Sequence, residues 1–281
     1  QPLLTSCRGR FSARSSLTDY LLCAVEIRHS AIVDYVAKGL DMNVVVSQSM
    51  LFPWVGMLEQ IRLADIFVHY DDVQFSKGGF TNRGQVKTPD GMRWLTVPLD
   101  GLKLGQSITK AAVLEKSAWR DNHIGLLQRS FAGAPFRDDA LDLVHSVYDK
   151  PITGLGMLAR RSMLAIADYY RLCDSTRFVD VSTLRIPGSG SQRVLDVVKA
   201  VGGTHYITGH GAKNYLEHDL FEEQGIRVLY MSYRRAPYRQ LHGEFTPFVS
   251  SLDLIANCGQ DGRRHICSNA VYWKDLLSES H

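Results

Sequence analysis

Two adjacent carboxylates, Asp71 and Asp72, are the residues of this sequence best suited to catalysis. They follow residues 66–70, an apolar run with the length of a buried strand. A carboxylate at a strand end can act as a base, bind Mg²⁺ or accept a hydrogen bond from a sugar hydroxyl. Because adjacent strand residues point to opposite faces, only one of the two is expected to face a cleft. The structural alternative is an acid that caps a turn or helix.

Polar and cationic side chains follow these acids along the chain. They are Gln74, Asn82, Arg83 and Lys87. Amide, guanidinium and ammonium groups hold phosphates and hydroxyl-rich ligands. We therefore assign these residues to substrate binding beside the acids, although their spacing matches no defined motif. The acids are the candidate catalytic groups, and Mg²⁺ is the one cofactor that they indicate.

A second candidate segment is the loop at 48–56, between a predicted strand (43–47) and a predicted helix (56–64). Ligands of open α/β sheets lie where strand ends and helix starts converge. The loop is placed like the phosphate loop of nucleotidylyltransferases but lacks the two histidines found there, which weakens adenylyl transfer. The structural alternative is a turn whose tryptophan side chain packs in the core. The residues assigned to substrate binding are Gln48, Pro53, Trp54 and Gly56.

A glycine-bearing loop at 208–214 follows another predicted strand. Its backbone N–H groups and the following helix start could bind an anion, and Lys213 would add a positive charge. The spacing is not that of a Walker motif, so a tight turn is the alternative. We assign Gly209, Gly211 and Lys213 to substrate binding. His210 is either an acid–base group or a solvated loop residue, and we count it among the catalytic candidates.

The order of predicted elements favours an α/β fold with a parallel-type, Rossmann-like sheet flanked by helices. Strand–helix–strand units occur at both ends of the chain, and a mainly helical subdomain at about 118–186 is inserted between them. A hairpin around 89–91 and a strand at 107–114 are also predicted. The predicted units are strands 43–47, 66–70, 204–207 and 226–230, with helices 56–64, 191–201 and 215–224.

The two loops are expected to meet at one edge of this sheet. If strand 204–207 lies in the same sheet as strand 43–47, the glycine loop approaches the loop at 48–56. The first loop and the segment 71–83 should also line one cleft, because consecutive parallel strands end on the same side.

Several separated segments resemble the WbqC-like protein family, in the order in which that family has them, from Met42 to about Gly259. The chain departs from the pattern at Ser49 and Leu51, where the family commonly has Pro and Tyr, so any role of that tyrosine hydroxyl is absent. The matching segments are the loop at 47–56, Asp71-Asp72-Val73-Gln74-Phe75, Asn82-Arg83, Trp94-Leu95-Thr96-Val97-Pro98, Tyr206-Ile207-Thr208-Gly209, Gly211-Ala212-Lys213, Phe245-Thr246-Pro247, Ser250-Ser251-Leu252-Asp253-Leu254 and Asn257-Cys258-Gly259.

The resemblance implies a bacterial protein of surface-polysaccharide (O-antigen) biosynthesis, and it implies a pathway more firmly than a reaction. We therefore expect a cytosolic transferase that acts on a nucleotide-linked or otherwise activated sugar. The alternative is a non-catalytic nucleotide-sugar-binding or scaffold protein of the same pathway. The expected partner in both cases is a small molecule.

Composition agrees with a globular protein and excludes other classes. The chain has 281 residues, 45% hydrophobic and 22% charged, which suffices for a sizeable core. A net charge of +3 does not favour nucleic acid, and no apolar stretch is long enough to span a membrane. Five dispersed cysteines argue against a disulfide framework, and the ten histidines form no ligand-spaced pair. We predict no structural metal.

Three features outside these loops are open to structural interpretations. The basic pair Arg234-Arg235 is predicted to be solvated surface. Asp253 and Asn257 share one face if 250–257 is helical, and Asp253 is left unassigned. Residues 1–41 begin without Met, are rich in Arg and Ser, and have a transit-peptide-like composition. Because both the pattern and the resemblance begin at Met42, we interpret 1–41 as an N-terminal extension outside the fold and 42–281 as the domain.

Overall fold

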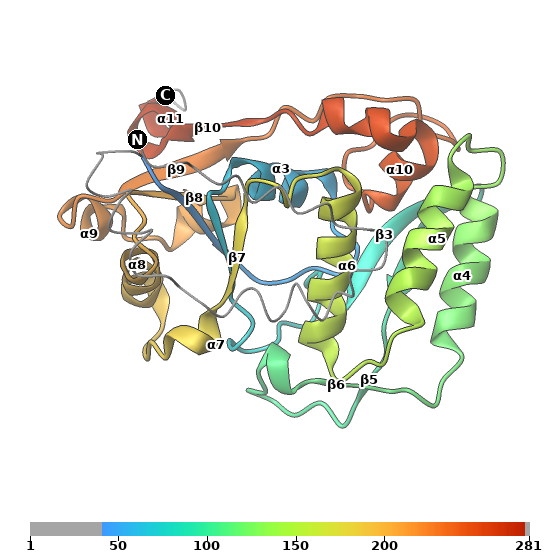
Figure 1. Cartoon of the computed structure of the whole chain (residues 1–281), viewed down its shortest axis with the longest axis horizontal. Coiled ribbons are helices and arrows are strands. Elements are labelled where there is room, and N and C mark those ends of the chain that lie inside the picture. Colours follow the sequence, from blue (N-terminus) through green and yellow to red (C-terminus); the bar gives the residue numbers. More distant parts are fainter. Residues whose placement is uncertain (1–40, 279–281) are drawn as a thin grey trace, which may run out of the picture.

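The computed structural model describes residues 41–278. The N-terminal extension predicted at 1–41 lies outside these residues except for its last one. A six-stranded sheet crosses the molecule, and a second lobe of helices and short strands packs against it (Figure 1). No helix of the described residues is both long and apolar enough to cross a bilayer.

The central sheet has the order β10-β9-β8-β1-β2-β7. All neighbouring strands run parallel except β9 and β10. The predicted α/β fold with a mostly parallel sheet is therefore confirmed. The pairing of β8 with β1 also confirms that the two ends of the chain share one sheet. The strands are β1 (Asn43–Ser47), β2 (Ile66–His69), β7 (Arg177–Asp180), β8 (His205–Thr208), β9 (Arg227–Ser232) and β10 (Asn269–Tyr272).

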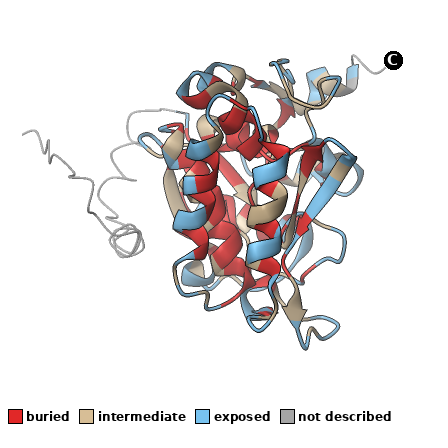
Figure 2. Ribbon diagram, turned by 90° about the vertical axis from the view of Figure 1, so that its right-hand side faces the viewer, coloured by how far each residue is buried: buried red, intermediate tan, exposed pale blue. Residues whose placement is uncertain are grey.

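The strands are apolar on both faces because helices cover both. Val44 belongs to one buried cluster and Val45 to the other, as strand alternation requires. Helices α3 (Val55–Leu63) and α6 (Leu155–Tyr169) pack on the face of Val45. Helices α8 (Gly190–Ala200) and α9 (His218–Glu222) pack on the face of Val44. The inward sides of the helices are buried and their outward sides exposed (Figure 2).

The second lobe contains the inserted helices and two antiparallel strand pairs, β3–β4 and β5–β6. Its hairpin confirms the turn predicted around 89–91. Its apolar side chains join the cluster of Val45, so the lobe and the sheet share one core. The elements are β3 (Arg83–Thr88), β4 (Gly91–Thr96), β5 (Leu99–Asp100), β6 (Ala112–Val113), α4 (Trp119–Ser130), α5 (Arg137–Tyr148) and α10 (Leu252–Cys258).

The structure corrects three predicted elements. The strand predicted at 107–114 is a 3-10 turn, Ile108–Lys110, followed by the two-residue β6. The helix predicted at 215–224 is only the short α9. The helical segment predicted at 118–186 contains α4 to α6, but its final part forms strand β7, whose four residues are too few to show a period. The chain then continues through α7 (Val181–Leu184), and α11 (Trp273–Ser278) ends the described residues.

Candidate functional site at the carboxyl edge of the sheet

The carboxyl ends of the parallel strands β7, β2, β1, β8 and β9 lie along one edge of the sheet. Between β1 and β8 the chain changes direction across the sheet. Helix α3, which follows β1, packs on one face, and α8, which precedes β8, packs on the other. In open α/β sheets such a topological switch point leaves a crevice in which ligands bind. The loops after β1 and β8 border this point.

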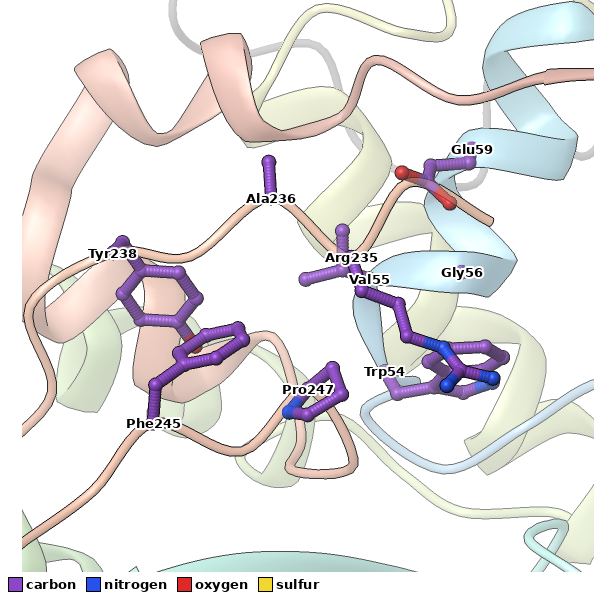
Figure 3. Close-up of a pocket in the computed structure, with 9 residues that line it drawn as sticks. All are labelled: Trp54, Val55, Gly56, Glu59, Arg235, Ala236, Tyr238, Phe245 and Pro247. Atoms are coloured by element: carbon purple, nitrogen blue, oxygen red, sulfur yellow. The ribbon is translucent and has the colours of Figure 1, made fainter. Parts of the chain in front are cut away.

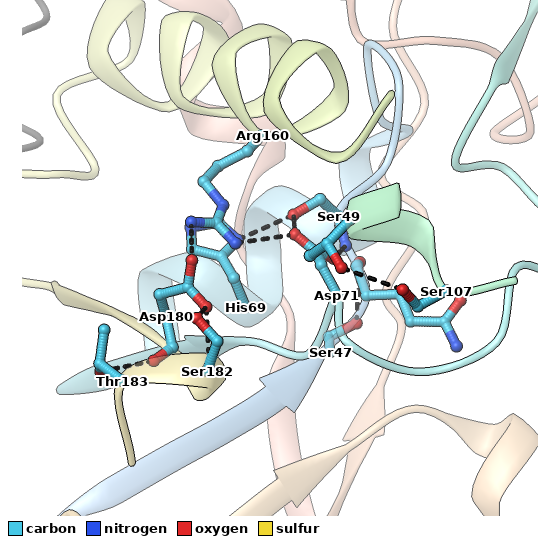
Figure 4. A network of polar contacts seen from close by, with 11 residues as sticks. Ser47, Ser49, His69, Asp71, Ser107, Arg160, Asp180, Ser182 and Thr183 are labelled. Atoms are coloured by element: carbon cyan, nitrogen blue, oxygen red, sulfur yellow. Dashed lines mark hydrogen bonds and ion pairs between the residues drawn. The ribbon is translucent and has the colours of Figure 1, made fainter. Parts of the chain in front are cut away.

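Asp71 is held by a buried polar network (Figure 4). The backbone N–H of Ser49 donates to its Oδ1 at 2.8 Å, and the Ser49 hydroxyl donates to its Oδ2 at 2.8 Å. Arg160 of α6 places one guanidinium nitrogen 3.0 Å from Asp71 Oδ2 and another 2.7 Å from Asp180 Oδ2. The Asp71 side chain is fully buried, so its charge requires such a partner.

His69 completes this network. Its Nδ1 lies 2.9 Å from the Ser49 hydroxyl oxygen. Since that hydroxyl donates to Asp71, His69 Nδ1 carries the proton and donates to it. Burial, together with the nearby Arg160 charge, lowers the pKa of His69 well below its ordinary value. The ring is therefore neutral, and its buried Nε2 has no hydrogen-bond partner among residues 41–278.

Asp72 points to the other face of the sheet. Arg193 of α8 binds it with two nitrogens, at 3.0 Å and 2.5 Å. The same guanidinium lies over the Tyr70 ring, 4.8 Å from its centroid. The two adjacent acids thus separate to opposite faces, as strand alternation predicts.

Both predicted catalytic carboxylates are engaged inside the fold. Each oxygen of Asp71 and of Asp72 already accepts a hydrogen bond. Each carboxylate is thus paired with an arginine, Asp71 with Arg160 and Asp72 with Arg193. In the described part of the chain, no three His, Cys, Asp or Glu side chains are grouped to hold a metal ion.

Tyr233 connects the glycine loop with the helix after the first loop. Gln60 of α3 donates to its hydroxyl at 2.9 Å. A Cβ built on Gly209 would lie 2.9 Å from the same oxygen, so the loop approaches closely only because this residue is glycine. The His210 ring packs against Tyr233 with centroids 5.5 Å apart. We call Gln60, Gly209, His210 and Tyr233 the switch-point cluster.

His210 has a defined orientation within this cluster. Its Nε2 lies 2.6 Å from the carbonyl oxygen of Met231. A carbonyl only accepts, so Nε2 carries the proton and Nδ1 of the neutral ring is left as an acceptor. The residue is exposed, and its Nδ1 has no hydrogen-bond partner among the residues that the structure describes. His210 therefore presents an exposed acceptor, whereas both aspartates are paired with arginines.

The rest of the glycine loop is open. A Cβ on Gly211 would meet no atom within 4 Å. Lys213 is half-buried, with its ammonium 6.0 Å from the Tyr230 ring centroid. No ion pair engages Lys213 within residues 41–278. Its charge is consequently available to an anion.

The first loop places two predicted binding residues, Trp54 and Gly56, against one another. The ring of Trp54 lies so close to Gly56 that a Cβ there would be 2.2 Å from it. The same ring packs against Tyr233, with centroids 5.0 Å apart. The carbonyl of Pro53 accepts from the Ser251 N–H at 2.8 Å. Trp54 is half-buried, packs against the core cluster of Val45 and borders a surface hollow (Figure 3). Gln48, the residue after β1, is also half-buried.

Four predicted binding residues make contacts elsewhere. Asn82 donates to the Val97 carbonyl at 3.1 Å. Arg83 donates to the Gly79 carbonyl and lies over the Trp94 ring. Lys87 donates to the Gly243 carbonyl at 3.0 Å and to the Glu244 carbonyl. Gln74 is exposed and forms an isolated antiparallel β-bridge with Ser107. Within the described residues, no contact joins these four to the switch-point cluster.

The first loop and the segment 71–83 are adjacent, as predicted. Besides the Ser49–Asp71 contact, the Leu51 N–H donates to the Phe80 carbonyl at 2.9 Å. The hollow that they share is lined by Phe80, by loop residues 51–54 and by residues 84–85 and 248–250. Gln74, Asn82 and Arg83, which were expected in such a cleft, do not line it.

Three important residues escaped sequence reasoning: Arg160, Arg193 and Tyr233. A buried acid needs a cation, but many arginines could have supplied it, and the partner of Asp71 lies 89 positions away. Arg193 reaches Asp72, and Tyr233 reaches Gln60, only because of the order of the strands in the sheet. No local motif marks any of the three.

The arrangement defines a doubly wound α/β protein with two loops at one switch point. The chain belongs to the WbqC-like protein family, whose model matches residues 48–265. It is 30% identical over 221 residues to Rv1507c of Mycobacterium tuberculosis, covering 78% of this chain and 95% of that protein, which is described as uncharacterized. No solved structure matches. The resemblance stated from the sequence is thus confirmed.

Proposed function

We propose that the protein binds a nucleotide-linked or otherwise activated sugar at the switch point between β1 and β8. It transfers a group from that ligand in the cytoplasm, in bacterial surface-polysaccharide (O-antigen) biosynthesis. The observation that carries this proposal is the topology, which places the loops after β1 and β8 side by side at the carboxyl edge.

The charge distribution supports a phosphorylated ligand. Arg160 and Arg193 are neutralised by their aspartates, whereas Lys213 has no acidic partner in the described part of the chain. An ammonium group beside a glycine loop attracts a diphosphate. The first loop holds no cation, so the phosphates belong at the glycine loop and the sugar towards Trp54 and Tyr233.

His210 is the group placed best for acid–base chemistry. Its Nδ1 would take the proton of an acceptor hydroxyl while the hydroxyl oxygen bonds to the sugar carbon. The bond from that carbon to the diphosphate oxygen breaks, and the nucleoside diphosphate leaves with the electron pair. Asp71 then has a supporting role, because it fixes the first loop through Ser49.

A second candidate is a non-catalytic nucleotide-sugar-binding or scaffold protein that uses the same crevice. The observation in its favour is that both strand-end carboxylates are paired with arginines. Such a protein binds the same ligand as a transferase but releases no nucleoside diphosphate.

Calorimetric titration with UDP-, GDP- and dTDP-sugars tests the proposal. At least one should bind the wild type, and Lys213→Ala should weaken that binding about tenfold or more, as for loss of a charge-assisted hydrogen bond. Lys116→Ala, which removes an exposed lysine from the second lobe, is the matched control. Chromatographic detection of released nucleoside diphosphate, and its loss in His210→Ala, separates the transferase from the binding protein. Equal binding by Lys213→Ala and the wild type would exclude the glycine loop as the phosphate site.

A further inference from the structure

We propose that a patch of exposed aromatic rings and arginines docks onto the surface of an anionic lipid bilayer. The rings belong to Phe80, Trp94 and Phe248, of which 43%, 39% and 52% are exposed. They are half of the six large hydrophobic residues that are exposed within residues 41–278. We call these three residues the aromatic patch. Exposed apolar side chains that gather in one place mark a contact with another molecule, and this inference does not depend on the proposed function.

The three rings lie on one continuous surface, although they are far apart in the sequence. Phe80 and Trp94 have ring centroids 6.0 Å apart. Phe80 and Phe248 line the same small hollow. The backbone beneath them is joined, since the Ser250 N–H donates to the Gln85 carbonyl at 2.7 Å. The fold therefore holds the three rings together.

The segments that carry these rings, 76–97 and 233–250, are strongly basic. Together they hold seven lysines and arginines against two acids, a net charge of +5, whereas the whole chain has a net charge of +3. The ion pairs of residues 41–278 involve none of these seven cations. The positive charge of the protein is thus concentrated in the two segments of the aromatic patch, which indicates an anionic partner. The cations are Lys77, Arg83, Lys87, Arg93, Arg234, Arg235 and Arg239.

Two of these arginines lie directly against rings of the patch. The guanidinium carbon of Arg83 is 4.2 Å from the centroid of the Trp94 ring. That of Arg235 is 5.2 Å from the centroid of the Phe248 ring. Each contact places a positive charge beside an exposed ring. At a membrane surface such rings enter the boundary of the apolar layer, and the neighbouring cations attract the anionic headgroups.

A bilayer fits this surface better than a second copy, a nucleic acid or a protein side chain. Two copies that met through the patch would bring two basic surfaces together. Bases need free ring faces for stacking, but guanidinium groups lie over Trp94 and Phe248. The hollow between Phe80 and Phe248 has room for only about one water molecule, so it cannot receive a side chain. A fluid bilayer needs no pocket, because its headgroups and acyl chains adapt to the rings that enter it.

Co-sedimentation of the full chain with lipid vesicles tests the charges of the patch. Vesicles of phosphatidylglycerol and phosphatidylcholine in equal parts should bind the wild type about tenfold or more tightly than vesicles of phosphatidylcholine alone. Arg93→Gln and Arg235→Gln should each weaken binding to the anionic vesicles about fivefold, the effect of one basic residue near such a surface. Lys116→Gln, which removes an exposed lysine outside both segments, should bind as the wild type does.

The same vesicles test the rings. The double variant Phe80→Ala/Phe248→Ala should weaken binding about tenfold, because about half of each residue is free to enter the bilayer. Tyr215→Ala, which removes an exposed ring outside both segments, is the matched control and should bind normally. Brominated phosphatidylcholine in the anionic vesicles should quench the tryptophan fluorescence of the wild type. Trp94→Phe should lose most of this quenching while it still sediments with the vesicles.

Melting curves show which variants are folded, and if the double phenylalanine variant does not melt cooperatively, the two arginine variants and Trp94→Phe decide. The proposal is overturned if the anionic vesicles do not bind the wild type, if the folded patch variants bind as tightly as the wild type, or if the controls lose as much. Analytical ultracentrifugation without lipid and titration with oligo-dT check the other partners. A dimer that the patch variants abolish would assign the patch to a second copy, and oligo-dT binding that they abolish, without vesicle binding, would assign it to nucleic acid. Either result overturns the proposal.

Discussion

Ser49 contacts Asp71 twice, through its backbone N–H to Oδ1 and through its hydroxyl to Oδ2, each at 2.8 Å. These bonds tie the loop after β1 to the end of β2. Arg160 then ties the same carboxylate to α6 and, through Asp180, to the end of β7. One buried network therefore ties the loop after β1 to the ends of β2 and β7 and to α6.

Removing the guanidinium from this network should destabilise the protein strongly. Arg160→Leu leaves Asp71 buried without a cation, which costs about 3–5 kcal/mol of unfolding free energy. Urea denaturation measures this change. Arg264→Leu is the control, because its ion pair with Asp261 is exposed on both sides and is worth about 0–1 kcal/mol. A loss in Arg160→Leu no larger than in Arg264→Leu would show that the network is not structural.

The sequence predicted the sheet well because its signals are local. The valines of β1 and the apolar run of β2 need only strand length and burial to be recognised. Strand β7 was missed because it has only two apolar residues, between Arg177 and Asp180. It is recognised as a strand only through its pairing with β2. Tertiary pairing is not visible in a local pattern.

The site was predicted in part for the same reason. The two strand-to-helix loops lie at the carboxyl edge, since topology follows from element order. The acids follow β2 as predicted, but their ion pairs with Arg160 and Arg193 depend on contacts across the fold. Lys87 has an ordinary sequence context, and only the fold determines that its ammonium binds backbone carbonyls.

Lys87 and Lys213 should differ in their effect on stability. Lys87 is buried and donates to two carbonyls and to Gln240, so Lys87→Met should cost about 1–3 kcal/mol. Lys213→Met should cost less than about 0.5 kcal/mol, because the side chain makes no hydrogen bond or ion pair in the described residues. Parallel urea melts of both variants measure the difference. Equal costs would contradict the assignment of Lys87 to structure and of Lys213 to ligand.

Asp253 should make stability fall with rising pH. Burial raises its pKa to about 6, while Tyr238 donates to it at 2.9 Å. The folded protein keeps this proton up to about pH 6, whereas the unfolded chain releases it at about pH 4. The unfolding free energy therefore contains a contribution that falls by roughly 2–3 kcal/mol between these values.

Asp253→Asn should remove that contribution. The measurement is the difference in unfolding free energy between wild type and variant from pH 4 to pH 7. The lowered pKa of His69 gives a slope of opposite sign, but it is present in both proteins and cancels in the difference. A difference that stays constant with pH would show that Asp253 titrates normally.

Two glycines of one loop should respond differently to the same substitution. Gly209→Ala places a methyl group 2.9 Å from the Tyr233 hydroxyl and disturbs its bond from Gln60, costing about 0.5–1.5 kcal/mol. Gly211→Ala meets open space and should leave the melting temperature unchanged. Thermal melts of the two variants compare them directly. A Gly209→Ala protein as stable as Gly211→Ala would show that the switch-point cluster is loosely packed.

Hydrogen–deuterium exchange with and without a bound nucleotide sugar tests the central claim most directly. The switch-point account predicts that the ligand slows amide exchange in segments 47–50 and 208–214, on both sides of the β1–β8 junction. Segment 119–130, helix α4 of the second lobe, serves as the internal reference and should be unaffected. Protection confined to segments away from the β1–β8 junction, or no protection by any nucleotide sugar of the panel, would contradict the account.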